Sequence, residues 1–255
     1  MTPARRAAGV ACLLLLGAAC PGPRPLPAPL PPLAGSPLEV LALARARVEG
    51  MQRLNAVAVA RGFTALPGLS VTLDIFAARP GRLYVAARGF FGPPTDEVIT
   101  DGERFLWRST RPGAGARGPA TPEALGALLP VALPPSQWVG LLLGLPLPDE
   151  PARAVQGCRE PETGALRCVR VQLADSEVEL WVDGAARVRE ARLSGARGGA
   201  QVSYLEPRPA WRDLAAVLRL AAGKLTAEVR FSEVELDGLE PPPSLFAPLG
   251  TQAAP

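Results

Sequence analysis

Histidine is absent from this chain of 255 residues, and lysine occurs once, at Lys224, among 27 basic residues. Without imidazole the chain can form no histidine-ligated metal site and has no histidine base to activate a serine or cysteine nucleophile. The carboxylates lie in loop-like segments or alternate with apolar residues of predicted strands. We therefore predict that the protein is not an enzyme and carries no metal or other cofactor.

A strong charge of either sign is also lacking. The chain has 27 basic and 24 acidic residues, and its first 19 residues hold two arginines and no acid. Without that segment the chain has 25 basic and 24 acidic residues and a formal charge of +1. Nucleic-acid-binding domains carry concentrated basic surfaces, so we expect no nucleic-acid partner.

Residues 1–19 have the pattern of an export signal peptide. Arg5 and Arg6 precede an apolar run at 9–19, which suits a signal peptide and is well short of the ~20 residues that span a bilayer. The run ends in Leu-Gly-Ala-Ala-Cys, where small residues suit a signal peptidase and the Cys20 thiol can accept a diacylglyceryl group. We predict a lipoprotein cleaved before Cys20. The alternative is an ordinary secretory signal with an incidental cysteine.

A proline-rich stretch at 21–37 follows the cysteine. Proline favours extended polyproline II structure and removes backbone donors, so this stretch predicts a tether. Pro21 stands where an aspartate would signal inner-membrane retention in enterobacteria, which favours the outer membrane. We therefore expect an outer-membrane lipoprotein that faces the periplasm, with one domain at 38–248 and a disordered tail at 249–255.

The hydrophobic period in that domain changes from helical to strand-like. Apolar residues at helical spacing predict an amphipathic helix at 38–54. Alternation with period two predicts short strands between 55 and 109 and again between 155 and 236. Asp101-Gly102 predicts a hairpin turn between two of them. Because turn residues separate successive strands, we expect an antiparallel up-and-down order.

Two short helices interrupt the strands. Thr121 followed by Pro122 predicts a capped helix that runs to about residue 129. A second helix at 135–143 has no charged residue and must be buried, dock on lipid or cover an apolar surface. The alternation of the last strand slips near Ser232, which predicts a β-bulge. Together these elements predict a mainly β (α+β) fold: an unclosed antiparallel β-barrel of about eleven strands with an N-terminal helix and a short helical lid.

The order of elements and several short motifs resemble the LolA/LolB superfamily of bacterial periplasmic lipoprotein carriers and outer-membrane lipoprotein receptors, including its uncharacterised lipoprotein relatives. The matching segments are Pro-Gly-Arg-Leu-Tyr-Val at 80–85, Gly-Phe-Phe-Gly at 89–92, Asp-Gly at 101–102, Trp-Val-Gly-Leu-Leu-Leu-Gly-Leu-Pro at 138–146, and the last strand pair around Leu218 and Val229. The resemblance covers about 38–248. It implies a concave apolar face that receives acyl chains, helices that cover this face when it is empty, and a LolA-like carrier as a partner.

The resemblance also implies two sets of site residues. The loop after the third strand would insert an apolar residue into the membrane, and Phe90 and Phe91 hold that position; alternatively, Phe90 caps the barrel and Phe91 packs on the N-terminal helix. The second set would line an acyl groove, with ordinary core packing as the alternative for each member. These residues are Ile75, Val85, Trp107, Trp138, Leu142 and Leu180.

Cys158 and Cys168 flank a turn-rich centre and would both reach an oxidising compartment after export. We predict a disulfide between them that stabilises a hairpin. The alternative, a redox or metal-binding thiol pair, lacks the close Cys-x-x-Cys spacing.

Residues 113–118 read Gly-Ala-Gly-Ala-Arg-Gly and satisfy the G-x-G-x-x-G string. A dinucleotide site needs this string to follow a strand and to open a helix, whereas here Pro112 and Pro119 enclose it. We predict a flexible loop. The sequence as a whole thus favours a lipoprotein that binds lipid or lipoprotein acyl chains in an apolar groove. The alternative is a non-catalytic envelope scaffold whose barrel is filled by its own side chains.

Overall fold

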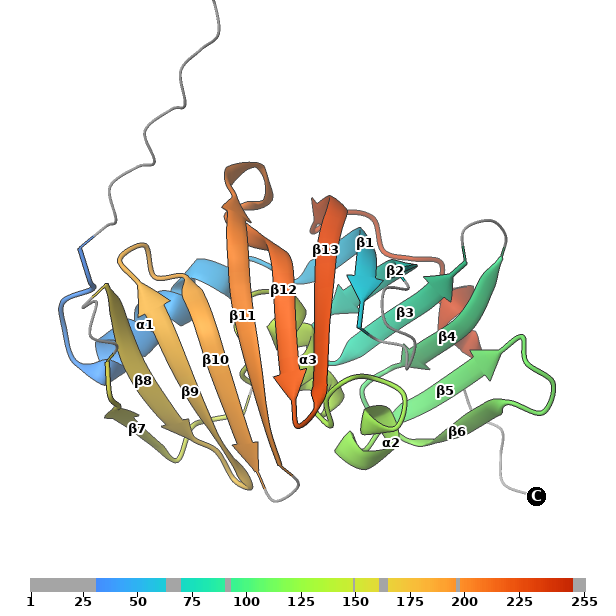
Figure 1. Ribbon diagram of the computed structural model, residues 1–255, viewed down its shortest axis with the longest axis horizontal. Helices are drawn as coiled ribbons and strands as arrows, with labels where there is room; N and C mark the ends of the chain where they lie inside the picture. The colour runs from blue at the N-terminus through green and yellow to red at the C-terminus, as the bar shows by residue number, and fades with distance from the viewer. Residues whose placement is uncertain are drawn as a thin grey trace, which may run out of the picture.

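A single antiparallel sheet of 13 strands forms most of the domain in the computed structural model (Figure 1). The structure describes residues 31–62, 70–89, 93–148, 150–160, 165–195 and 198–249. The strands are β1 (Arg53–Arg61), β2 (Ser70–Ala78), β3 (Arg82–Arg88), β4 (Pro94–Thr100), β5 (Arg104–Ser109), β6 (Gly115–Pro119), β7 (Ala154–Gly157), β8 (Leu166–Gln172), β9 (Ser176–Asp183), β10 (Val188–Gly195), β11 (Gly198–Arg208), β12 (Leu214–Ala222) and β13 (Leu225–Leu236).

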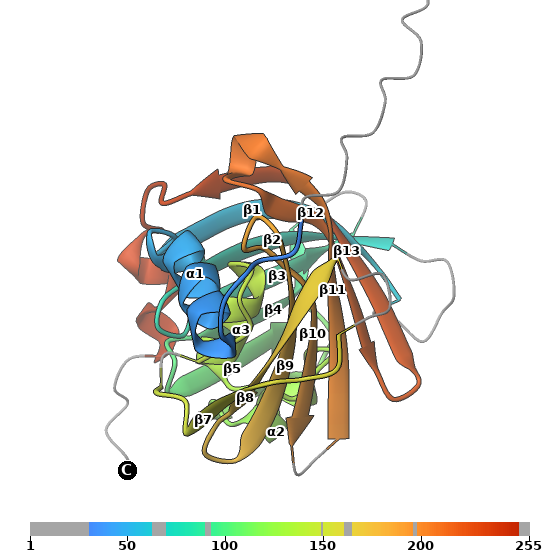
Figure 2. The same cartoon turned by 90° about the vertical axis from the view of Figure 1, so that its left-hand side faces the viewer.

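Strands that follow one another in sequence pair with one another, except for β6 and β7, and β1 pairs with β13. The two halves of the chain are therefore joined at the centre of the sheet, while β6 and β7 form its two edges. The sheet curls around its helices without closing (Figure 2). This arrangement confirms the unclosed antiparallel barrel, although the sheet has more strands than the eleven or so expected.

Strand β6 corrects one prediction, because the glycine-rich string at 113–118 contributes to a strand rather than a flexible loop. Residues of β6 pair with β5, with Ala116 opposite Trp107 and Arg117 opposite Leu106. An edge strand needs a partner on one side only, and glycine and proline are tolerated there. Four of its five residues are exposed, so the strand shows no apolar alternation by which the sequence could reveal it.

The β-bulge predicted near Ser232 is confirmed. Val57 faces Glu233 while Ala58 faces Phe231, so Ser232 is the extra residue of a β-bulge. The Ser232 hydroxyl donates to the Val57 carbonyl oxygen at 3.1 Å.

The turn between β4 and β5 lies at Asp101-Gly102, as predicted. Gly102 has a φ of 108°, a conformation that favours glycine. The Asp101 carboxylate accepts from the backbone N–H groups of Glu103 and Arg104 at 2.9 and 2.8 Å.

The N-terminal helix α1 (Pro37–Glu49) packs against β7 and β8 (Figure 2). Ser36 caps it, and the Glu39 side chain bonds back to the Ser36 backbone in a capping box. The helix ends at Glu49, earlier than the predicted residue 54, because β1 already begins at Arg53. Its buried face consists of Val40, Leu41, Ala44 and Val48.

The helical interruption lies between β6 and β7 and contains α2 (Pro122–Gly126) and α3 (Pro135–Leu142). Thr121 caps α2 as predicted, with its hydroxyl accepting from the Ala124 N–H at 3.3 Å, but the helix ends three residues before position 129. Helix α3 lies inside the curl of the sheet and contacts β2 and β3. No helix within the described ranges is both long and apolar enough to cross a membrane.

A disulfide joins Cys158 to Cys168, with the two Cα atoms 5.1 Å apart, as predicted. It links the end of the short edge strand β7 to β8, the strand that pairs with it. A link across this loop is worth about 3 kcal/mol of unfolding free energy in the chain-entropy account. The disulfide therefore secures a strand that has only four residues of pairing.

The chain after β13 crosses back over the first half of the sheet. It contains the short 3-10 turns η2 (Pro243–Leu245) and η3 (Ala247–Leu249), and a third turn, η1 (Pro209–Trp211), joins β11 to β12. Phe246 packs edge-on against Phe76 with 5.8 Å between ring centroids, and Arg82 lies 4.4 Å above the Phe246 ring. Leu249 is buried, so the packed domain reaches at least this residue.

Candidate functional site

Three predicted groove residues lie in one row across the concave face of the sheet. The strand register places Ile75 between Ala56 and Val85. It places Val98 between Val85 and Trp107. All five side chains belong to the hydrophobic core or pack against it. The row is therefore apolar, as expected, and its side chains point toward the interior of the half-barrel.

The other three predicted groove residues are buried in the same core. Leu180 in β9 is fully buried, and Trp138 and Leu142 in α3 are each 6% exposed. The structure thus brings all six together around the inner face of the half-barrel. The remaining predicted site residues, Phe90, Phe91 and the lipidation site Cys20, lie outside the described residues.

Helix α3 occupies the space that an open groove would need. Every residue of the helix except Ser136 is buried. The Tyr204 hydroxyl donates to the Leu141 carbonyl oxygen at 3.2 Å, and burial raises the pKa of Tyr204 well above its usual range, which keeps this donor protonated. The Gln137 side chain donates to the Pro146 carbonyl oxygen at 3.1 Å. Both ends of the helix are therefore tied to neighbouring backbone.

The energetic cost of lifting α3 shows that it is a fixed wall. Undocking would expose Trp138, Val139, Leu141, Leu142 and Leu143, all of them buried. At about 1.5–3 kcal/mol for each side chain, the cost is on the order of 10 kcal/mol. That is comparable to the whole stability of a typical domain, about 5–15 kcal/mol. The helix covers the concave face, as expected, and the cost of undocking it favours ligand binding beside the helix rather than beneath it.

A cleft of about 530 Å³ remains at one end of the half-barrel. It lies between the α2–α3 connection and the tips of the β8–β9 and β10–β11 hairpins. Its volume is within the range of about 300–1,000 Å³ that is typical of small-molecule sites. The described residues that border it are Pro122, Glu123, Pro130, Val131, Ala132, Leu133, Pro134, Ser136, Gln137, Pro148, Glu150, Leu173, Ala174, Asp175, Ser176, Leu193, Ser194, Gly199, Ala200 and Ala222.

The cleft is continuous with the hydrophobic core. Val131, Leu133, Leu173, Leu193 and Ala200 border it, and all five belong to the core cluster. None of the six predicted groove residues is among the described residues that border this cleft. An apolar chain that entered here would contact core side chains beside α3 without displacing the helix.

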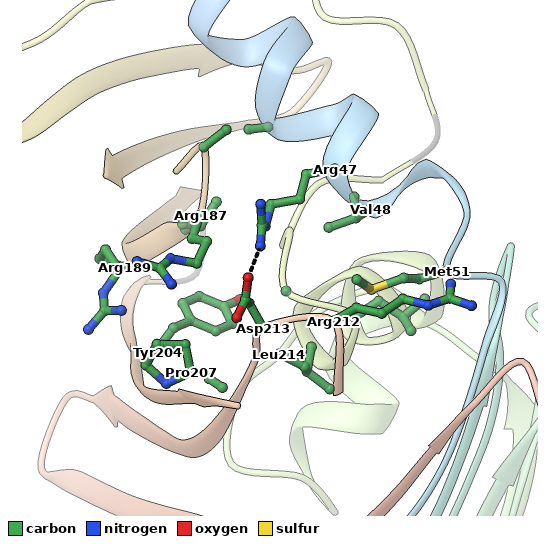
Figure 3. Close-up of a pocket in the computed structure, with 16 residues that line it drawn as sticks. Arg47, Val48, Met51, Arg187, Arg189, Tyr204, Pro207, Arg212, Asp213 and Leu214 are labelled. Carbon is green, nitrogen blue, oxygen red and sulfur yellow. Dashed lines mark hydrogen bonds and ion pairs between the residues drawn. The ribbon is translucent and has the colours of Figure 1, made fainter. Parts of the chain in front are cut away.

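Figure 3 shows a second, much smaller hollow, where α1 meets the turns at the other end of the strands. Its volume of about 30 Å³ has room for roughly one water molecule. Arg47 of α1 forms an ion pair with Asp213 here and donates to the Ala185 carbonyl oxygen at 2.9 Å. These contacts fix α1 to the β9–β10 and β11–β12 turns, and the hollow is the joint between these elements rather than a ligand site.

A third hollow of about 510 Å³ lies on the convex face beneath the C-terminal segment. Asp74, Glu233, Glu235 and Tyr84 border it. The Tyr84 hydroxyl donates to the Glu97 carboxylate at 2.9 Å, and burial together with this carboxylate raises its pKa to about 12. Apolar residues border this hollow as well, among them Phe76, Leu245 and the predicted groove residue Ile75, but it lies outside the half-barrel. Across the described residues, no cluster of three or more acidic or cysteine side chains could hold a metal ion.

The sequence matches no protein-family model and no curated protein. Three solved structures share the architecture. A domain from Vibrio parahaemolyticus, assigned as an outer membrane lipoprotein-sorting protein, is 11% identical with a TM-score of 0.56, over 80% of this chain and 93% of that one. A LolA superfamily protein from Nitrosomonas europaea is 11% identical with a TM-score of 0.53, over 84% and 98% of the two chains. A DUF1329 family protein from Desulfovibrio piger is 12% identical with a TM-score of 0.56, over 81% and 96%. The chain therefore has a LolA/LolB-like fold.

Proposed function

We propose that the protein is a non-catalytic outer-membrane lipoprotein, anchored by acyl chains on Cys20, that binds an acyl chain of a lipid or lipoprotein in the cleft beside α3. The observation that carries the proposal is this cleft of about 530 Å³, which opens directly onto core side chains of a LolA/LolB-like half-barrel. Burial of an alkyl chain against such a surface is favourable by about 0.8 kcal/mol for each CH₂ group.

The position of the cleft suits exchange with a soluble partner. Arg167, near the start of β8, donates to the carbonyl oxygens of Leu33 and Gly35 at 3.1 and 3.3 Å. The chain that leads back toward Cys20 therefore leaves the domain at this end of β8. The cleft borders Leu173, just past the opposite end of β8. Its mouth thus faces away from the tether, where a LolA-like periplasmic carrier would have access to it.

A filled scaffold is the second candidate function. The specific observation in its favour is that α3 and the concave rows already form one continuous core within the described residues. A scaffold of this kind would use its outer surface and leave the cleft empty. The two candidates differ in whether an alkyl chain enters the cleft.

A substitution that places a bulky side chain in the cleft distinguishes acyl-chain binding from the filled scaffold. Ala222 borders the cleft at the end of β12, opposite Ala200 of β11. We expect Ala222→Phe to weaken binding of a 16-carbon lipid to the unacylated mature chain at least tenfold, because the ring occupies space that the lipid needs. Ala221→Phe is the matched control, since Ala221 precedes Ala222 in the same strand, faces the opposite side of the sheet and does not border the cleft.

The measurements are lipid binding by calorimetry, the melting temperature, and native mass spectrometry for co-purified lipid. Equal affinities for the two variants and the parent, or no lipid bound to any of them, would favour the filled scaffold. A large loss of stability in Ala222→Phe alone would make the variant uninformative about affinity, in which case the smaller change Ala222→Val replaces it.

The anchor is tested at Cys20 itself. Cells that produce the full chain should incorporate labelled palmitate into the protein, and Cys20→Ala should abolish the label because no thiol remains at the cleavage site. Membrane fractions should lose the protein in parallel. Label retained by the variant would refute the lipoprotein proposal, and label associated with the inner membrane would refute the proposed location alone.

A further inference from the structure

The outer face of α1 is apolar and exposed. Among the described residues three large hydrophobic side chains are exposed, and two of them, Leu38 at 63% and Leu43 at 47%, belong to this helix. Ala42 and Ala46 are exposed as well. Residues three or four positions apart are neighbours on a helix surface, so these four side chains form one continuous apolar face. This face is on the outside of the half-barrel, turned away from the sheet (Figure 2).

The charges around this face suit contact with phosphate groups. Arg45 is exposed in the middle of the helix and forms no ion pair with another described residue. The two acids, Glu39 and Glu49, lie near opposite ends of the helix. The Glu39 carboxylate accepts from the Ser36 N–H and hydroxyl at 2.6 and 2.9 Å. The central part of the face therefore carries apolar side chains and one unpaired positive charge.

The turn between β11 and β12 extends this surface past the end of α1. Arg212 donates to the Gly50 carbonyl oxygen at 3.2 Å, which places the turn beside the helix end. Arg208 and Arg212 are exposed, and Trp211 is partly exposed. Each arginine pairs with one acid, at 3.8 and 3.0 Å, but exposed pairs are weak and a guanidinium has further donors for phosphate. Tryptophan is enriched where proteins meet the membrane–water interface.

The place where the tether joins the domain indicates a membrane as the partner of this surface. Arg167 holds the carbonyl oxygens of Leu33 and Gly35, directly before α1. The chain between Cys20 and Leu33 reaches at most about 40 Å, so an acyl anchor on Cys20 would keep α1 within that distance of the bilayer. At this range the effective concentration of the surface at the membrane is on the order of millimolar. A contact that is weak by itself is then well populated.

We infer that the outer face of α1 and the turn at 208–212 rest on the phospholipid surface of the membrane that holds the anchor. Leu38 and Leu43 enter the boundary between head groups and acyl chains, and the arginines contact the phosphates. The inference rests on the proposed anchor at Cys20. None of these surface residues borders the cleft, so docking leaves its mouth open to a soluble carrier. Because the contact is weak, the domain can also leave the membrane surface, as delivery through Phe90 or Phe91 requires.

The test uses the chain from residue 21 onward, which contains every described element, with an N-terminal hexahistidine tag in place of the acylated cysteine. The chain has no histidine of its own, so only the tag binds nickel-chelating lipid in vesicles of phosphatidylcholine and phosphatidylglycerol. Cys158 and Cys168 are joined, so one introduced cysteine can carry an environment-sensitive fluorophore. The labelled variants are Leu38→Cys, Leu43→Cys and, as the control, Thr226→Cys at an exposed position of β13.

On these vesicles we expect the emission of the labels at positions 38 and 43 to shift to the blue and to be quenched by nitroxide-labelled lipid. The label at position 226 should show neither change. Labels at 38 and 43 that stay in water would overturn the inference. A blue shift that appears without vesicles and rises with protein concentration would also overturn it, because the face would then contact a second copy of the chain.

A pair of leucine substitutions makes the expectation quantitative. Leu43→Ser should lower the equilibrium constant for docking, read from the label at position 38, by about tenfold, because the leucine no longer enters the membrane. Leu239→Ser removes the same side chain from an exposed position of the C-terminal segment, outside this surface, and should leave the constant unchanged. Equal docking by the two variants would overturn the inference alone. A lack of palmitate on Cys20 in cells would overturn the proposed anchor and this inference together.

Discussion

Leu141→Asp should lower the melting temperature of the domain by more than 10 °C, whereas Ser136→Asp in the same helix should leave it almost unchanged. Leu141 is fully buried in α3, and a carboxylate there would be left without a counterion or solvent. An unpaired buried charge costs several kcal/mol. For a domain of this size each kcal/mol shifts the melting temperature by roughly 2–4 °C.

Ser136 is the matched control because it is the one residue of α3 that is not buried. It lies in the first turn of the helix, where the helix dipole favours a negative charge. The melting temperature is measured by circular dichroism, and hydrogen exchange of the α3 amides provides the second measurement. A change of less than about 2 °C for Leu141→Asp, with fast exchange in α3, would show that the helix opens readily. The description of α3 as a fixed wall would then be wrong.

Features of the fold that depend on neighbouring residues were predictable from the sequence. The bulge at Ser232, the turn at Asp101-Gly102 and the cap at Thr121 each arise from side chains and backbone angles within a few residues. The pairing of β1 with β13 joins strands that are far apart in the sequence. A curled up-and-down sheet can bring these two strands together. Strand β6 was missed because its conformation is imposed by β5, and its own residues carry no apolar pattern.

The candidate site was predictable only in part, for a related reason. Alternation along a strand identifies which side chains share a face, and the register places the candidates Ile75, Val85 and Trp107 in one row of the sheet. Alternation cannot show which part of that face another element covers, and α3 covers it. The cleft is formed by hairpin tips and a proline-rich connection that are distant in sequence. The available signal was the apolar pair Val131 and Leu133 within that connection.

At least one of the variants Phe90→Glu and Phe91→Glu should abolish transfer of an acylated lipid from this protein to liposomes. The melting temperature of that variant should change little. Both residues lie outside the described residues, so this expectation comes from the sequence. Two adjacent aromatic side chains between Gly89 and Gly92 cannot both face one side of a strand. An exposed phenylalanine forfeits a few kcal/mol of possible burial, which suggests that it enters a membrane or a partner.

The alternative placement, with Phe90 capping the barrel and Phe91 packed on the N-terminal helix, predicts the reverse result. A glutamate forced into a packed core lacks a partner and should destabilise the domain by several kcal/mol. Thr95→Glu is the control, because Thr95 is an exposed residue of β4 on the same hairpin and its replacement adds the same charge. A large loss of stability at both phenylalanines, with none at Thr95, would reject membrane delivery by this loop. Lost transfer with retained stability, and normal transfer by Thr95→Glu, would identify the aromatic side chain rather than the charge as the element that meets the membrane.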